Sequence, residues 1–212
     1  MVGMVKCPRC WGTGLEPPRL TLPCGYCAGH QLVEDVQLSE HFLFGEWCRA
    51  REGCPNDPPP EAVERARNTL RYLVEPARQV LGVAFRVTSG YRCPQLDVIA
   101  DSGNPIWLTR LSAHALGSAF DLQAPPHTLR ELTEALRKNA KAAWDQLILE
   151  GGCVHAALEG PDEHGKALPA GAGRRRSQVM IRRLRVVEQD GPGSKFKYDT
   201  YTGTDEQMAL VV

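Results

Sequence analysis

A histidine and an aspartate that could bind a metal, His114 and Asp121, lie in the segment SAHALGSAFD, residues 112–121. Gly117 interrupts this segment, so we expect the two side chains to converge from a loop and the strand that follows it. The small residues at 117–119 would let the chain pass close to a metal. A nitrogen and a carboxylate ligand suit zinc with an open coordination position. Taken alone, a core histidine and a capping aspartate would explain the pair equally well.

Four cysteines near the N-terminus form a second candidate metal site. Cys7 and Cys10 make one C-x2-C pair, and Cys24 and Cys27 make another, with thirteen residues between the pairs. Two thiolate pairs supply the tetrahedral ligands of a structural zinc, which would contribute the folding free energy of so short a module. Unligated thiols or disulfides are the alternative. Residues 7–14 also resemble one cysteine-rich repeat of the J-domain co-chaperones, which we interpret as a zinc-knuckle form and not as a chaperone assignment.

Three further motifs frame the segment that holds His114 and Asp121. The sequence VTSGYR (87–92) precedes it, WDQLILE (144–150) follows it, and Val154-His155 closes the set. In this order the four motifs resemble those of the zinc D-Ala-D-Ala carboxypeptidase and L-alanyl-D-glutamate endopeptidase family, over about residues 36–187. The resemblance implies a hedgehog/D,D-peptidase-like domain that hydrolyses an amide bond in the peptide stem of peptidoglycan.

The resemblance also implies roles for individual residues. His114, Asp121 and His155 would bind a catalytic zinc and leave one coordination position for water. Arg92 would meet a carboxylate or a carbonyl oxygen of the substrate, where a guanidinium group can stabilise developing negative charge.

The general base is less directly implied. Glu150 is the candidate that would accept a proton from the attacking water and pass it to the leaving amine, and Asp145 is the alternative. Relatives with a glutamate three residues before the last histidine would carry it where this chain has Gly152. Ser112 would support the first histidine, and it completes the predicted substrate-binding set together with Tyr91, for which a core position is the alternative.

Helices and short strands must position these residues. Apolar residues recur at helical spacing over 61–81, where Pro76 predicts a kink or two consecutive helices. Residues 128–131, Thr-Leu-Arg-Glu, are a capping-box signature that begins a predicted helix over 129–143. The predicted strands are 83–87, 119–122, 146–149, 154–158 and 178–187, the predicted loops are 97–111 and 159–173, and 189–212 is weakly patterned.

This mixture of helices and strands has no repeating βαβ rhythm, so it predicts an α+β fold with a small mixed or antiparallel sheet and flanking helices. We divide the chain into a four-cysteine zinc module (1–34), a zinc peptidase domain (35–188) and a C-terminal tail (189–212).

The composition narrows the choice of partners. The chain has 25 Lys+Arg and 25 Asp+Glu, and this balance argues against electrostatic binding of nucleic acid. The basic residues at 174–176, 182, 183 and 185 could form the solvated face of a strand or a contact with an anionic polymer such as glycan strands. No apolar run is long enough to span a bilayer, and no signal-peptide pattern is visible.

We therefore expect a monomer made in a host cytoplasm that acts at the cell wall or in the periplasm, as a phage lysin or a virion-associated wall hydrolase. Its partner would be the peptidoglycan stem peptide, with neither nucleic acid nor membrane, and it would hold one catalytic and one structural Zn²⁺. A non-catalytic wall-binding or virion structural protein of the same fold is the first alternative. A nucleic-acid or protein adaptor, based on the zinc knuckles alone, is the second.

Overall fold

The computed structural model describes residues 4–7, 32–49, 56–100, 105–169, 171–176, 178–188 and 195–202. Within the N-terminal module, strand β1 (Met4–Lys6) pairs antiparallel with β2 (Leu32–Glu34). This pairing brings together the two ends of the segment that carries the cysteines. Cys7 is buried directly after β1, whereas Cys10, Cys24 and Cys27 lie outside the described residues, so the structural zinc site stays a prediction.

The centre of the molecule is a six-stranded mixed sheet with the order β3-β4-β6-β5-β7-β8. All neighbouring strands run antiparallel except β5 and β7, which are parallel. Together with the helices this confirms the predicted α+β class. The strands are β3 (Arg86–Ser89), β4 (Ala119–Gln123), β5 (Gln146–Glu150), β6 (Cys153–Ala157), β7 (Gln178–Glu188) and β8 (Lys195–Thr202).

The helical rod predicted over 61–81 consists of α2 (Pro60–Thr69), a π-helical turn η1 (Leu70–Val74) and α3 (Glu75–Leu81). Pro76 explains the interruption, because it has no N–H to donate to the carbonyl of Tyr72 four residues earlier. The backbone N–H of Lys141 donates to that carbonyl instead, at 2.7 Å. The irregularity predicted at Pro76 is thus a π-helical turn within one continuous rod, and the bond to Lys141 ties this rod to the segment that follows the next helix.

Helix α6 (Leu129–Asn139) begins with the predicted capping box but ends earlier than the sequence suggested. Thr128 Oγ1 accepts from the backbone N–H of Glu131 at 3.2 Å, and the Glu131 carboxylate accepts from the N–H of Thr128 at 2.8 Å. The chain leaves the helix at Ala140, whose backbone is extended, because Lys141 bonds to Tyr72 of the neighbouring helix.

Three other predictions were wrong in part. The first β-strand of the domain is Arg86–Ser89 and not 83–87. The predicted loop 97–111 overlaps the second half of helix α4 (Pro94–Ala100) and contains the 3₁₀ turn η2 (Pro105–Leu108). Helix α4 was missed because one of its two buried residues is the charged Asp97. Within the predicted tail, β8 pairs with β7.

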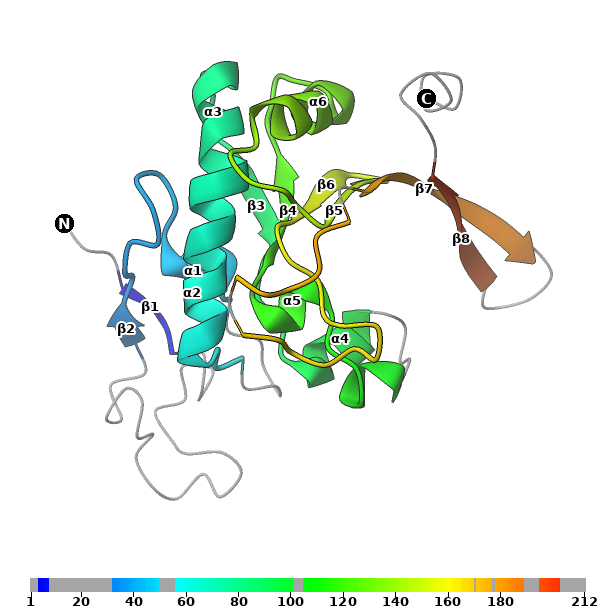
Figure 1. Cartoon of the computed structure of the whole chain (residues 1–212), viewed down its shortest axis with the longest axis horizontal. Coiled ribbons are helices and arrows are strands. Elements are labelled where there is room, and N and C mark those ends of the chain that lie inside the picture. Colours follow the sequence, from blue (N-terminus) through cyan, green and yellow to red (C-terminus); the bar gives the residue numbers. More distant parts are fainter. Residues whose placement is uncertain are drawn as a thin grey trace.

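Figure 1 shows α2 and α3 as one long rod beside the sheet, with α6 near one end of the rod and the short helices α4 and α5 (Ala113–Leu116) near the other. Helix α1 (Phe44–Trp47) contacts β3. Alternate residues of the strands face the helical layer and form the main core; on β4 these are Phe120 and Leu122. Among the described residues, no helix combines the length and hydrophobicity needed to cross a membrane.

Candidate metal centre

One row of cross-strand neighbours carries two of the predicted metal ligands. Asp121 on β4 lies directly opposite His155 on β6, and His155 lies opposite Ile148 on β5. On the other side of β4, Asp121 is opposite Ser89 at the end of β3. Residues that face each other across antiparallel strands point to the same side of the sheet. The strand register therefore places Asp121 and His155 next to each other on the face that is opposite the main core.

His114 reaches this row from α5, a helix of one turn and not the predicted loop. Ser112 caps the helix, since its Oγ accepts from the N–H of Ala115 at 3.0 Å. Gly117 ends it with φ of 86°, and a side chain there would collide with the backbone of Ala62 on α2. So short a helix leaves no periodicity in the sequence, which is why it was not predicted.

The three side chains meet within hydrogen-bonding distance. His114 Nε2 lies 3.1 Å from His155 Nδ1, and Asp121 Oδ1 lies 3.0 Å from His155 Nδ1 and 3.2 Å from His114 Nε2. Ligand atoms about 2.0–2.1 Å from a tetrahedral zinc lie about 3.3 Å apart. The observed triangle is thus close to the size that three ligands adopt around one ion, and the group could hold a metal ion.

The second nitrogen of His114 determines which tautomer faces the group. His114 Nδ1 donates to the carbonyl oxygen of Gly90 at 2.6 Å, so Nε2 of the neutral ring carries no proton. Only glycine fits at position 90, because a side chain there would collide with Trp47 of α1. Nε2 and the carboxylate Oδ1 of Asp121 are then two acceptors facing each other, an arrangement that a bound cation stabilises.

Electrostatics favour the metal-binding forms of these residues. Burial lowers the pKa of His114, which keeps the imidazole neutral. Burial alone would raise the pKa of Asp121, but the attraction of the His114 and His155 imidazoles in their protonated forms outweighs it and holds that pKa well below its usual range. A neutral histidine and an ionised aspartate are the forms that bind metal ions.

Arg92 is held beside the group of His114, Asp121 and His155 by a residue that the sequence analysis missed. Arg92 Nε donates to Oδ1 of Asp97 at 2.7 Å, and its Nη1 lies 3.7 Å from Asp121 Oδ2. The other carboxylate oxygen of Asp97 accepts from the hydroxyl of Ser112. Asp97 is buried on α4, and it links Arg92 to the cap of the helix that carries His114. The short distance in sequence between Arg92 and Asp97, five residues, was the signal that could have identified this pair.

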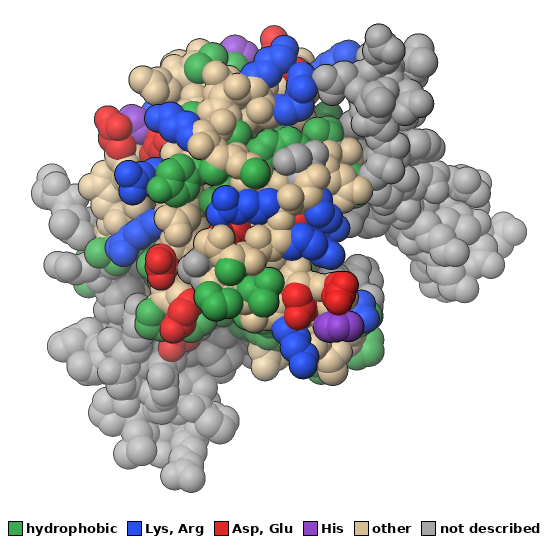
Figure 2. Space-filling model, viewed as in Figure 1, with side chains coloured by type: hydrophobic (Ala, Val, Ile, Leu, Met, Phe, Trp, Pro, Cys, Tyr) green, Lys and Arg blue, Asp and Glu red, His purple; other side chains and the backbone are tan. Residues whose placement is uncertain are grey.

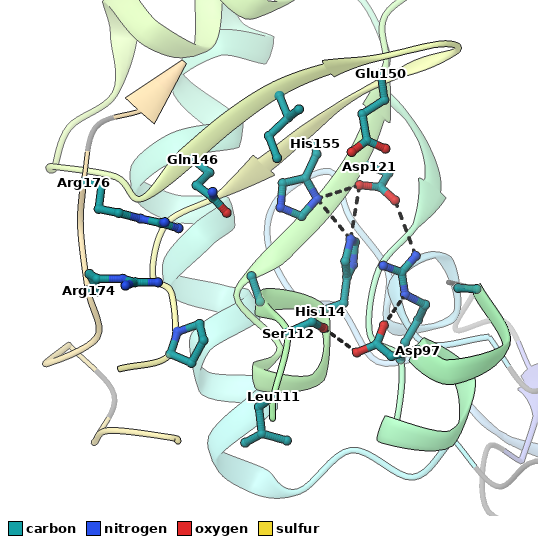
Figure 3. A pocket seen from close by; sticks show the side chains of 15 residues that line it. Asp97, Leu111, Ser112, His114, Asp121, Gln146, Glu150, His155, Arg174 and Arg176 are labelled. Carbon is teal, nitrogen blue, oxygen red and sulfur yellow. Dashed lines mark hydrogen bonds and ion pairs between the residues drawn. The ribbon is translucent and has the colours of Figure 1, made fainter. Parts of the chain in front are cut away.

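A cavity of about 410 Å³ opens over this group (Figure 3). Glu150, Arg92 and Ser112 line it together with His114, Asp121 and His155. Figure 3 shows the Glu150 carboxylate directed toward Asp121 and His155. The alternation of β5, in which 146, 148 and 150 share a face, explains why Glu150 reaches the cavity.

Asp145, the alternative base, does not line the cavity. It is fully buried and binds Arg176 through two bonds of 2.7 Å, from Nε to Oδ1 and from Nη2 to Oδ2. A side chain at Gly160 would collide with it. Asp145 therefore anchors the segment that ends at Arg176, and of the two candidate carboxylates only Glu150 lines the cavity.

Two other residues close to the site in the sequence, Tyr91 and Cys153, lie apart from the chemistry. Tyr91 is buried and packs against Trp47, with ring centroids 5.5 Å apart, so its side chain belongs to the core and does not line the cavity. Cys153 is half-buried, and burial raises the pKa of its thiol to about 12. The thiol is therefore protonated at neutral pH and is a poor nucleophile.

Comparisons of the chain with models of protein families, with curated proteins and with solved structures gave no match. The site itself defines a class of protein, an α+β domain with a buried His-Asp-His group that could hold a metal ion in the wall of an open cavity.

Proposed function

We propose that the protein is a zinc metallopeptidase that hydrolyses an amide bond in the peptide stem of peptidoglycan. The observation that carries the proposal is the close approach of His114, Asp121 and His155, whose ligand atoms lie 3.0–3.2 Å apart in a cavity that Glu150 also lines. Two imidazoles and one carboxylate suit zinc, and three protein ligands leave a position toward the cavity. Bound zinc would lower the pKa of water and polarise the scissile carbonyl.

The other cavity residues supply what hydrolysis needs beyond the metal. Glu150 would accept the proton of the attacking water and transfer it to the leaving nitrogen. Arg92 would donate to the carbonyl oxygen as negative charge develops there. Asp97 fixes the guanidinium of Arg92 in one orientation through the 2.7 Å bond, so little side-chain entropy would be lost when substrate binds.

The order of the four sequence motifs supports peptidoglycan as the substrate. Both activities of the family that the chain resembles, D,D-carboxypeptidase and L-alanyl-D-glutamate endopeptidase, act on the stem peptide. A phage lysin or a virion-associated wall hydrolase is the biological role that we propose. A second zinc bound by the four N-terminal cysteines would raise the metal content to about two ions per chain.

A pair of carboxylate variants tests the enzyme proposal. The zinc-loaded protein should clear purified peptidoglycan in a zymogram, and Glu150→Gln should lower the rate by about a hundredfold or more while zinc stays bound. His114→Ala should lose both activity and the cavity zinc. Asp145→Asn is the matched control, because it breaks a buried pair with Arg176; it should lower the free energy of unfolding and leave the activity of the folded fraction within about tenfold.

The same experiment separates the main alternative, a non-catalytic wall-binding or virion protein. Gly152 favours this alternative, since this turn position carries no side chain where relatives place a glutamate. If the zinc-loaded protein sediments with peptidoglycan but cleaves none of several wall types, the enzyme proposal is wrong and the binding protein remains.

A further inference from the structure

The cavity has a second cationic wall, away from Arg92, that the proposed chemistry does not use. Arg174 and Arg176 line this wall. Figure 3 shows both side chains pointing from the 160–176 segment toward the metal group, with Gln146 on the same side of His155. Figure 2 shows Lys and Arg side chains gathered near the centre of one face of the molecule. An anionic part of a ligand is the chemistry that such a wall would attract.

The two arginines of this wall differ in what they bind. Arg176 forms the bidentate pair with Asp145, at 2.7 Å for both bonds, so its charge is already paired and two of its five N–H donors are used. Arg174 has no salt bridge among the described residues, and its Nε is buried without a hydrogen-bond partner there. Because Nε is closed to solvent, a ligand in the cavity would meet the terminal guanidinium nitrogens of Arg174, whose positive charge has no counter-charge among the described residues.

The backbone of Arg174 is fixed, so its side chain starts from a defined place. Arg174 and Gly160 exchange two backbone hydrogen bonds, of 2.9 and 3.1 Å. The neighbouring Arg175 donates to buried Glu159 at 2.9 Å, and Glu159 also accepts from the N–H of Gly171 at 3.2 Å. These bonds hold both ends of the segment that carries the arginine wall.

We propose that Arg174, beside Arg176, forms a carboxylate subsite that holds a free carboxylate of the peptide substrate. This inference rests on the proposed function, because the peptide stem supplies the ligand. A guanidinium offers two parallel N–H donors that match a carboxylate. Glu150 repels an anion at its own end of the cavity, whereas Asp97 already engages Arg92. Arg174 is therefore the cavity cation available for a second charged group of the substrate.

Two carboxylates of the stem could occupy the subsite, the C-terminal carboxylate and the α-carboxylate of D-glutamate. The test is calorimetric binding of a stem peptide to the metal-free full chain, which leaves the peptide intact, together with two analogues in which one or the other carboxylate is an amide. One amide should bind about tenfold more weakly to the wild type, and this identifies the carboxylate.

Three variants complete the test. Arg174→Gln should bind the stem peptide about tenfold more weakly and should no longer prefer the carboxylate peptide over its amide analogue. Arg174→Lys keeps the positive charge but not the two parallel N–H donors, so it should retain part of that preference. Arg130→Gln is the control, since Arg130 is exposed on α6 outside the cavity, and it should bind like the wild type. Thermal unfolding checks that each variant is folded.

Two outcomes would overturn the subsite: a preference for the carboxylate that survives in Arg174→Gln, or no measurable binding of any of the three peptides. A failure of the proposed function looks different. In that case the wild type discriminates between acid and amide through Arg174, yet the zinc-loaded protein cleaves neither.

Discussion

The two faces of the central sheet are built from the same strands and do different work. On β4, Phe120 and Leu122 point toward the helical layer and are fully buried in the main core, whereas Asp121 between them points toward the cavity. On β6 the same alternation places Val154 and Ala156 in the core and His155 in the cavity. One face thus provides stability and the other presents chemical groups.

This division explains how buried ionisable groups are tolerated here. Asp121 and His155 lie on strands β4 and β6, whose other face is packed in the main core. This packing fixes the positions of the two side chains, which need no apolar contacts of their own. Two of the cavity residues are in turn oriented by a neighbour: Gly90 accepts from His114, and Asp97 accepts from Arg92. Substitutions at adjacent residues of one strand should therefore have separable effects.

The largest effect on stability is expected for Phe120→Ala. The ring is fully buried and contacts Phe42 and Trp47, with centroids 6.3 and 6.5 Å away. Its removal should lower the free energy of unfolding by about 3–5 kcal/mol, through lost burial and the cavity that remains. Urea unfolding measures this change, and the folded fraction should still bind zinc. A loss below about 1 kcal/mol would contradict the assignment of this face as the stabilising one.

The adjacent substitution, Asp121→Asn, should act almost entirely on metal binding. An amide oxygen is a weaker zinc ligand than a carboxylate. Even the substitution of a residue that only supports a metal ligand costs about 10–100-fold in metal affinity. We therefore expect zinc affinity to fall by about a hundredfold or more, as measured by competition with a chelator. The metal-free variant should unfold within about 1 kcal/mol of the metal-free wild type. Unchanged zinc affinity would remove Asp121 from the site.

A smaller effect is expected for Asp97→Asn, which tests how the cavity face is oriented. The amide can still accept one hydrogen bond, but it loses the charge that fixes Arg92 and the second oxygen that binds Ser112. The value of kcat/KM on peptidoglycan fragments should fall about tenfold, with zinc content unchanged. Loss of zinc together with activity would show instead that Asp97 supports the whole site.

The smallest effect is expected at the start of α6, on the helical side of the sheet. Thr128→Ala removes the side-chain cap and should lower the free energy of unfolding by about 1 kcal/mol without changing zinc affinity. Hydrogen bonds from the Thr128 N–H and hydroxyl lower the pKa of Glu131 below its ordinary value of 4.5. The contribution of Glu131 is therefore present above pH 4.5 and is lost as the pH falls through the lowered pKa.

Stability measured at neutral pH and below pH 4 checks the second part of this prediction. The difference between the wild type and Glu131→Gln should shrink as the pH falls. A difference that grows instead would show that the carboxylate does not take part in the capping box.

The sequence by itself was sufficient where the information is local. The resemblance of four ordered motifs to a known family pointed to His114, Asp121 and His155, and the capping box located the start of α6. The strands predicted over 119–122, 146–149, 154–158 and 178–187 match β4, β5, β6 and β7 to within one residue. Each of these signals lies within a few consecutive residues, because strand alternation, helix capping and the type of side chain a metal accepts are all local properties.

Only the tertiary structure decided between the two candidate bases. Asp145 directly precedes β5 and Glu150 ends it, and the alternation of the strand does not by itself say which of its two faces meets the cavity. Arg176, thirty-one residues after Asp145, binds that carboxylate and removes it from the chemistry, while Glu150 is left facing the cavity. Asp97 likewise meets the Ser112 hydroxyl only through folding, and folding places Arg174 in the wall of the cavity. Such pairings depend on which surfaces meet when the layers pack, a long-range outcome that no spacing in the chain records.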